Sequence, residues 1–155
     1  MNRITPFLWF DDNLEQAIEL YTSVFKDTKV LNVSRYTEAG PGPAGSVMTA
    51  TFELQGQQFM ALNAGPYFKF NEAVSFLVNC QTQQEVDEYW EKLTANGGEP
   101  GRCGWLKDRF GLSWQIVPDA LGQLLSDPKR AKNVMQAMLQ MGKINIAELE
   151  KAGEL

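Results

Sequence analysis

The chain has 155 residues, of which 44% are hydrophobic and 21% charged, values typical of a single globular domain and not of a disordered, collagen-like or coiled-coil chain. Its formal net charge is −5, which argues against a basic surface for wrapping nucleic acid. It contains no histidine, so the commonest general base and the commonest transition-metal ligand are both missing.

The chain carries two cysteines, Cys80 and Cys103, which are too few for a disulfide framework and favour a reducing, cytoplasmic setting. The N-terminal apolar run is broken by Asp11 and Asp12 and lacks the cleavage site of a secretory signal. No stretch approaches about 18 uninterrupted apolar residues. We therefore expect no membrane partner, and the acidic charge balance leads us to expect no nucleic-acid partner.

Up to residue 63 the pattern predicts a strand, a helix and three further strands. The first strand ends at Asp11–Asn13, residues that favour a helix N-terminus. Apolar residues at steps of three and four then predict the helix, and β-branched runs predict the strands. A Gly- and Pro-rich loop follows the second strand, and Gln55–Gln58 is typical of a hairpin turn. The predicted ranges are 4–10, 13–25, 28–37, 46–55 and 58–63.

The same order starts again at residue 73. Residues 73–80 are predicted to be a strand, and Thr82 with Glu85 forms a capping box for a helix that ends near Asn96. Residues 101–106 and 112–117 are predicted as strands. The duplication predicts an α+β fold made of two βαβββ modules, over about residues 1–64 and 73–118.

The tail differs from both modules and looks wholly helical. Asp127-Pro128 is predicted to start a helix. A stripe of methionines follows at helical spacing and is expected to be core or subunit contact, because methionine fills irregular gaps. We take residues 119–155 as a helical C-terminal extension of the domain formed by residues 1–118.

Four segments carry a family resemblance: 6–25 (PFLWFDDNLEQAIELYTSVF), 61–80 (ALNAGPYFKFNEAVSFLVNC), 103–118 (CGWLKDRFGLSWQIVP) and 127–152. They resemble the vicinal oxygen chelate superfamily, which includes glyoxalase I, extradiol dioxygenases and the bleomycin and fosfomycin resistance proteins. Within it they resemble the PhnB-like branch, often labelled 3-demethylubiquinone-9 3-methyltransferase-like. The resemblance implies that the modules form a curved mixed sheet with an open cavity.

The resemblance also says where a metal would be bound. Metal-dependent members place histidine, glutamine and glutamate on the inward faces of four strands. Those positions correspond to Thr5, to Ala73 or Ser75, to Gln115, and to Ala61 or Asn63, where the register is left open. None of these side chains ionises, and neutral donors bind divalent cations weakly. We therefore expect no metal and no cofactor.

The methyltransferase label is not supported by the residues. Most methyltransferases hold S-adenosylmethionine at a Gly-rich turn after the first strand of a Rossmann-like sheet. Here the first strand ends in Asp11–Asn13, without glycine. The sequence therefore does not predict that chemistry.

Alternation along the strands gives the candidate pocket. Thr5, Phe7 and Trp9 share one face of the first strand, and such apolar and neutral-polar faces suit a flat or hydrophobic molecule, although core packing is the commoner role for any single aromatic. Cys103 could be a reactive thiol beside Arg102 or a small buried residue. The pocket candidates are Thr5, Phe7, Trp9, Ala61, Asn63, Phe68, Ser75, Cys103, Trp105 and Gln115.

Three functions remain open. The first is a binding protein for a small hydrophobic or aromatic molecule, without the superfamily metal. The second is an enzyme of the same superfamily: a lyase, isomerase, dioxygenase or, by family label, a ubiquinone-pathway methyltransferase. Its acid–base candidates would be Glu53, Cys103, Lys107 and Asp108, with no catalytic residue assigned. The third is an interaction module that docks through its tail. The resemblance implies a homodimer.

Overall fold

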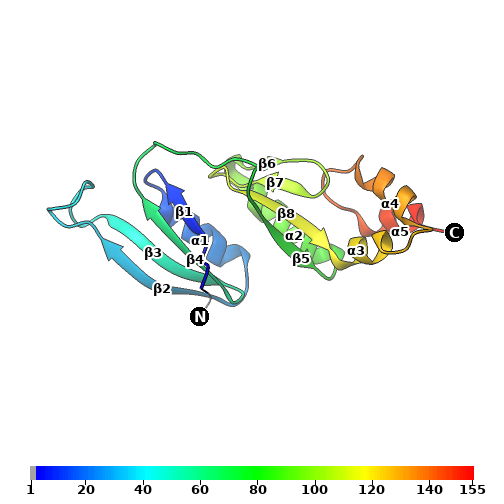
Figure 1. The fold of residues 1–155 in the computed structure, drawn as a ribbon, viewed down its shortest axis with the longest axis horizontal. Coiled ribbons are helices and arrows are strands. Elements are labelled where there is room, and N and C mark those ends of the chain that lie inside the picture. Colours follow the sequence, from blue (N-terminus) through cyan, green and yellow to red (C-terminus); the bar gives the residue numbers. More distant parts are fainter. Residues whose placement is uncertain (1–2) are drawn as a thin grey trace. The chain divides into compact units, whose positions relative to one another are not determined.

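The computed structural model describes residues 3–155. The chain divides into two compact units, one ending at Phe70 and the other spanning Asn71–Leu155, and each is described by itself (Figure 1). The elements of the first unit are β1 (Phe7–Phe10), α1 (Leu14–Val24), β2 (Thr28–Arg35), β3 (Val47–Leu54) and β4 (Gln57–Asn63). The predicted order of strand, helix and three strands is confirmed.

The four strands of the first unit form a mixed sheet in the order β1-β4-β3-β2. β1 runs parallel to β4, and the other neighbours are antiparallel. Helix α1 covers one face of the sheet because its apolar residues recur every third or fourth position, and four of them are buried. They are Leu14, Ala17, Tyr21 and Val24.

The first unit's core stacks aromatic rings between helix and sheet. Tyr21 of α1 stacks on Phe52 of β3 at 6.4 Å between ring centroids, and Phe52 stacks on Phe59 of β4 at 5.4 Å. Offset stacking of this kind adds to the free energy gained by burying the rings. The side chains that share a face with Phe52 and Phe59 therefore point toward α1.

The second unit repeats the arrangement with shorter strands. Its elements are β5 (Ser75–Cys80), α2 (Gln83–Thr94), the 3-10 turn η1 (Ala95–Gly97), β6 (Glu99–Pro100), β7 (Trp105–Lys107) and β8 (Ser113–Pro118). The sheet order is β5-β8-β7-β6, with β5 parallel to β8. The predicted N-cap is confirmed, since the Glu85 backbone N–H donates to Thr82 Oγ1 at 3.2 Å, while the Glu85 carboxylate accepts the N–H of Gln81, one residue before the cap, at 3.2 Å.

The predicted strand over residues 101–106 is wrong in part. Residues 101–104 form a turn between β6 and β7, because Cys103 and Gly104 adopt positive φ angles of 58° and 86°. At Gly104 an added Cβ would lie 3.0 Å from the Ile116 carbonyl oxygen and 3.1 Å from Ile144 Cγ1. Glycine is therefore favoured there by both backbone conformation and space.

The tail folds into α3 (Asp119–Leu125), α4 (Ala131–Met138) and α5 (Ile146–Ala152), as the helical pattern predicted. The predicted start at Asp127-Pro128 is early, because Asp127 Oδ1 first accepts the Lys129 N–H at 2.9 Å in a turn. The three helices enclose a small core that includes the buried stripe residue Met141. Within residues 3–155, no helix is long and apolar enough to cross a bilayer.

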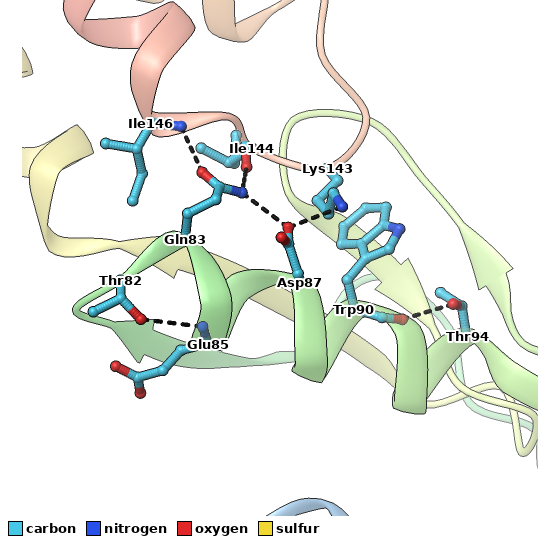
Figure 2. A network of polar contacts seen from close by, with 9 residues as sticks. All are labelled: Thr82, Gln83, Glu85, Asp87, Trp90, Thr94, Lys143, Ile144 and Ile146. Atoms are coloured by element: carbon cyan, nitrogen blue, oxygen red, sulfur yellow. Dashed lines mark hydrogen bonds and ion pairs between the residues drawn. The ribbon is translucent and has the colours of Figure 1, made fainter.

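The tail is fastened to the rest of its unit at two places. The Cys103 N–H donates to the Met141 carbonyl oxygen at 2.8 Å, and the Gly104 N–H donates to that of Gly142 at 2.9 Å. On the other side, Gln83 of α2 bonds the backbone of Ile144 and Ile146 (Figure 2). The extension is therefore an integral part of the second unit.

Candidate functional site

The first unit's sheet has one face covered by α1 and one open face. The parallel register pairs Phe7 with Met60 and Trp9 with Leu62. These four side chains alternate with the buried residues Leu8 and Phe10 and so lie on the open face. Of the pocket candidates in the N-terminal segment, Phe7 and Trp9 lie on this open face, and Thr5 lies just before β1. Phe7 is exposed, Trp9 is half-buried, and Thr5 is half-buried just before the strand.

The two candidates from β4, Ala61 and Asn63, lie on the side of the sheet that faces α1 and not on its open face. Ala61 is fully buried and pairs with Leu8, on the side of Phe59 and α1. Asn63 has the same orientation, and its Oδ1 accepts the Leu14 N–H at 3.0 Å. The register left open by the sequence thus resolves to Met60 and Leu62 as the open-face residues of β4.

Asn63 joins four segments of the first unit. Besides Leu14, its side-chain Nδ2 donates to Glu15 Oε1 at 2.9 Å and to the Val47 carbonyl oxygen at 3.2 Å. Its own carbonyl oxygen accepts the Tyr36 hydroxyl. A buried amide with this many partners holds the N-terminus of α1 and both flanking loops in place.

A cavity of about 420 Å³ opens beside Asn63, within the first unit. It lies between the start of α1, the loop that follows β2 and the segment that follows β4. Carboxylates come from α1 and the residues before it, and rings come from two tyrosines and three prolines. The lining comprises Asp11, Asp12, Glu15, Tyr36, Pro41, Gly42, Pro43, Ser46, Val47, Asn63, Ala64, Gly65, Pro66 and Tyr67.

Two aromatic candidates, Trp9 and Phe68, lie behind the segment after β4 that lines this cavity. The Trp9 indole Nε1 donates to the Gly65 carbonyl oxygen at 2.9 Å. Phe68 packs edge-on against Trp9, with ring centroids 4.8 Å apart and an interplanar angle of 81°. Neither residue is part of the lining. They position the segment that contributes Gly65 and Tyr67.

The open face of the second sheet carries the polar candidates. Ser75 and Gln115 lie on neighbouring strands, and Gln115 Nε2 donates to Ser75 Oγ at 3.0 Å. Trp105 is paired with Gln115 across β7 and β8 and is half-buried. Trp114, the next residue along β8, is 3% exposed and points to the side of α2, as the alternation predicts.

The donor set does not fit the metal of the superfamily. The open-face residues at the corresponding positions are Ser75, Gln115 and the apolar Met60 and Leu62, and Ser75 and Gln115 are bonded to each other. Neutral oxygen donors hold divalent cations weakly without a carboxylate or imidazole. Within residues 3–155, no group of three histidine, cysteine, aspartate or glutamate side chains is close enough to hold an ion.

The two thiols are free and differ in exposure. Burial, with smaller contributions from Glu85 and Asp119, raises the pKa of Cys80 to about 12, so this thiol stays protonated at neutral pH. Cys103 is half-buried in the turn before β7, not on a strand. Its backbone N–H is held by Met141. Its position in this turn gives it a structural role in joining the tail to the sheet.

The charged turn between β7 and β8 is mainly structural. Asp108 Oδ1 accepts the backbone N–H groups of Phe110 and Leu112, at 2.9 and 3.1 Å. Asp108 therefore caps its own turn, and its burial at 2% exposure makes it a poor acid–base candidate. Arg109 lies over the Phe110 ring at 5.0 Å, and Lys107 pairs with Glu72.

Two residues of the first cavity were not predicted from the sequence: Tyr36 and Glu15. Tyr36 and Glu15 line the first cavity, and both reach Asn63, which is 27 and 48 residues away. No local pattern signals contacts over such separations. Strand alternation does predict Ser113 on the face of Gln115, two residues along β8, and the register agrees.

The sequence matches the family model described as 3-demethylubiquinone-9 3-methyltransferase over residues 2–117, so the helical extension lies outside the match. Among solved structures, it is similar to a Bacillus cereus PhnB protein that carries that name provisionally. The identity is 37% and the TM-score 0.69, over 76% of this chain and 99% of that chain. No curated protein sequence matches the chain.

Two more distant structures share the fold. Protein PA1353 from Pseudomonas aeruginosa is 21% identical, with a TM-score of 0.62 over 77% of this chain and all of that chain (100%). The fosfomycin resistance protein FosX from Listeria monocytogenes, complexed with Mn(II) and sulfate, is 15% identical. Its TM-score is 0.56, over 81% of this chain and 95% of that chain.

Proposed function

The chain belongs to the PhnB-like family of the vicinal oxygen chelate superfamily, and we propose that it binds a small aromatic or hydrophobic molecule in the cavity of its first unit, without the superfamily metal. Fold membership alone does not decide activity, because one fold hosts many chemistries. The proposal therefore rests on the cavity and its lining.

The volume of the cavity and the residues that line it support the binding of a small aromatic or hydrophobic molecule. About 420 Å³ falls within the range of small-molecule sites, which are lined mainly by apolar and aromatic groups with a few polar ones. Tyr36 and Tyr67 offer flat rings, and Pro41, Pro43 and Pro66 offer apolar walls. This combination suits an aromatic body.

The charge at the cavity favours a ligand with a positive group. Asp11, Asp12 and Glu15 line it, and among the described residues, 3–155, no lysine or arginine does. Asp11 and Asp12 are exposed, so they attract a cation at the rim without the large cost of a buried charge. We therefore expect an aromatic amine to bind better than an aromatic acid of the same shape.

The buried wall of the cavity is formed by Tyr36, which is held in place by its neighbours. Tyr36 is buried, its hydroxyl bonds the Asn63 carbonyl, and an added Cβ at Gly42 would lie 2.5 Å from its ring. The glycine therefore permits a close approach of the loop to the ring. A wall fixed in this way lowers the entropy lost on binding.

An enzymatic role is the alternative, since the family model carries a methyltransferase name. β1 leads into Asp11–Asn13 and α1 without a glycine-rich turn, and each sheet is a four-stranded mixed sheet. This arrangement differs from the Rossmann-like site that most S-adenosylmethionine enzymes use. We expect S-adenosylmethionine to produce no saturable binding at either unit in calorimetry.

A matched pair of probes tests the proposal: 2-phenylethylamine and phenylacetate, titrated into the protein and followed by ¹H–¹⁵N NMR. We expect saturable shifts at Tyr36, Asn63 and Gly65 with the amine and much weaker ones with the acid. Asp12→Asn should reduce the preference for the amine about twofold to fivefold, the range of one exposed ion pair. The exposed Asp27→Asn should leave it unchanged.

The proposal fails if neither probe shifts these residues, or if the acid shifts them with the same affinity as the amine. A stoichiometric metal that a chelator removes would disprove its metal-free part. Turnover of the bound molecule would favour the enzymatic alternative.

A further inference from the structure

The second unit holds a smaller cavity, of about 130 Å³, on the open face of its sheet. Taking about 30 Å³ for each water in the liquid, it has room for roughly four waters. Its walls come from β6, β7, the first residue of β8 and the segment before β5. They include Glu72, Glu99, Pro100, Trp105, Lys107 and Ser113.

Ser113 places an unsatisfied hydroxyl at this cavity. The residue is 1% exposed, and within residues 3–155 its Oγ has no hydrogen-bond partner. A buried hydroxyl without a partner lowers stability, and most buried polar side chains do have one. The Ser113 hydroxyl is therefore available to a molecule in the cavity.

Lys107 lies directly opposite Ser113 in the antiparallel pair of β7 and β8. Side chains in such pairs stand about 5 Å apart at Cβ, so the ammonium and the hydroxyl can reach the same atom. The ammonium is paired with Glu72, which raises the pKa of Lys107 and lowers that of Glu72. Glu99 faces Lys107 on its other side.

The Glu72 side chain is held at its carboxylate by the ion pair with Lys107. Its side chain is 59% exposed and lies on the segment before β5, outside any helix or strand. Exposed ion pairs of this kind contribute little, so another carboxylate can replace it at a small cost.

We propose that this cavity binds a small organic carboxylate, which accepts hydrogen bonds from the Ser113 hydroxyl and the Lys107 ammonium and displaces Glu72. An ammonium offers only donors, so the ligand atom that meets both groups must be an acceptor. Exchanging one carboxylate for another keeps Lys107 neutralised, while Ser113 gains its missing partner. Trp105 and Pro100 provide an apolar wall, which suits an organic anion better than inorganic phosphate.

Propionate tests the site against two matched ligands, the neutral isostere propionamide and inorganic phosphate. In ¹H–¹⁵N NMR titrations we expect propionate to shift Trp105, Lys107 and Ser113 saturably, with a dissociation constant of about millimolar for so few atoms. Propionamide and phosphate should give weaker shifts. These residues lie in the second unit, so the outcome is independent of the binding proposed for the first.

Three variants separate this site from a structural ion pair. Ser113→Ala should weaken propionate binding about tenfold without destabilising the fold, because the hydroxyl it removes has no partner. Glu72→Gln should tighten binding about twofold to fivefold, because the internal competitor is weakened. The exposed Glu91→Gln removes the same charge from α2 and should leave binding unchanged.

Equal binding of propionate and propionamide would overturn the proposal, as would tighter binding of phosphate. So would a Glu72→Gln variant that binds propionate no better than the parent protein. A marked loss of stability in Ser113→Ala would show that the hydroxyl has a structural partner, which removes the premise.

Discussion

The Asp108 carboxylate, buried at the turn between β7 and β8, accepts a hydrogen bond at 2.9 Å from the indole Nε1 of Trp114. Its other oxygen accepts two backbone N–H groups of the same turn, from Phe110 and Leu112. One carboxylate thus ties the hairpin to a buried tryptophan on the side of α2. Charge-assisted hydrogen bonds of this kind are the stronger ones in proteins.

Removing the Asp108 carboxylate should destabilise the protein. We expect Asp108→Ala to lower the free energy of unfolding by about 2–4 kcal/mol, because it leaves buried donors without a partner. Urea denaturation measures the change. Asp108→Asn keeps the shape and part of the hydrogen bonding, and it should cost less. A loss below about 0.5 kcal/mol for the alanine variant would contradict this structural role.

The contact between Gln83 and the tail should hold the C-terminal extension in place. Gln83 Nε2 donates to the Ile144 carbonyl oxygen at 2.9 Å, and its Oε1 accepts the Ile146 N–H at 2.8 Å (Figure 2). Gln83→Ala should cost about 1–3 kcal/mol, since both of these hydrogen bonds and a third one, to Asp87, are lost. Hydrogen exchange at the Ile146 amide should accelerate. The neighbouring, exposed Gln84→Ala should do neither, and equal effects of the two variants would refute the contact's role.

The same contact should loosen in acid. The pKa of Asp87 lies below its ordinary value, first because Gln83 Nε2 donates to its carboxylate and then because Lys143 does. A carboxylate with a depressed folded pKa stabilises the fold above its ordinary pKa, and that stabilisation is lost as the pH falls through the folded value. We therefore expect the Ile146 and Lys143 NMR signals to move below about pH 4.

Asp87→Asn provides the control for this titration. The variant cannot ionise at this position, so its Ile146 signal should stay unchanged over the same pH range. A parent-like movement in the variant would assign the titration to another group.

Metal removal should have no effect on stability. The open-face residues Ser75 and Gln115 are neutral and hydrogen-bonded to each other, so we expect them to bind a divalent ion weakly. We expect the same Tm before and after dialysis against EDTA, and no saturable rise in Tm on adding Mn(II). A rise that EDTA reverses would contradict the metal-free proposal.

A homodimer is expected at micromolar concentration. β2 is an edge strand and exposes Val30, Leu31 and Val33, and exposed apolar edge strands favour pairing with another chain. Sedimentation should show a dimer that Val33→Lys weakens. Val74→Lys, at a more exposed valine in the second unit, should not weaken it. A monomeric parent protein would disprove the expectation.

The sequence by itself determined the elements and their order. The spacing of Leu14, Ala17 and Tyr21 predicted α1, and Thr82 with Glu85 marked the start of α2, because periodicity and capping act between residues close in sequence. The duplicated order and the family segments then predicted two βαβββ modules. It could not predict that Leu14 N–H is capped by Asn63, because that contact spans 49 residues.

Only the tertiary structure decided which side chains of β4 meet the open face. A shift of one residue in strand register turns every side chain to the other face, and nothing local to residues 57–63 fixes the register. Pairing with β1 places Met60 and Leu62 on the open face and turns Ala61 and Asn63 toward α1. Long-range contacts likewise bring Tyr36 to Asn63 and Glu72 to Lys107, so both cavities depend on contacts between segments that the sequence keeps apart.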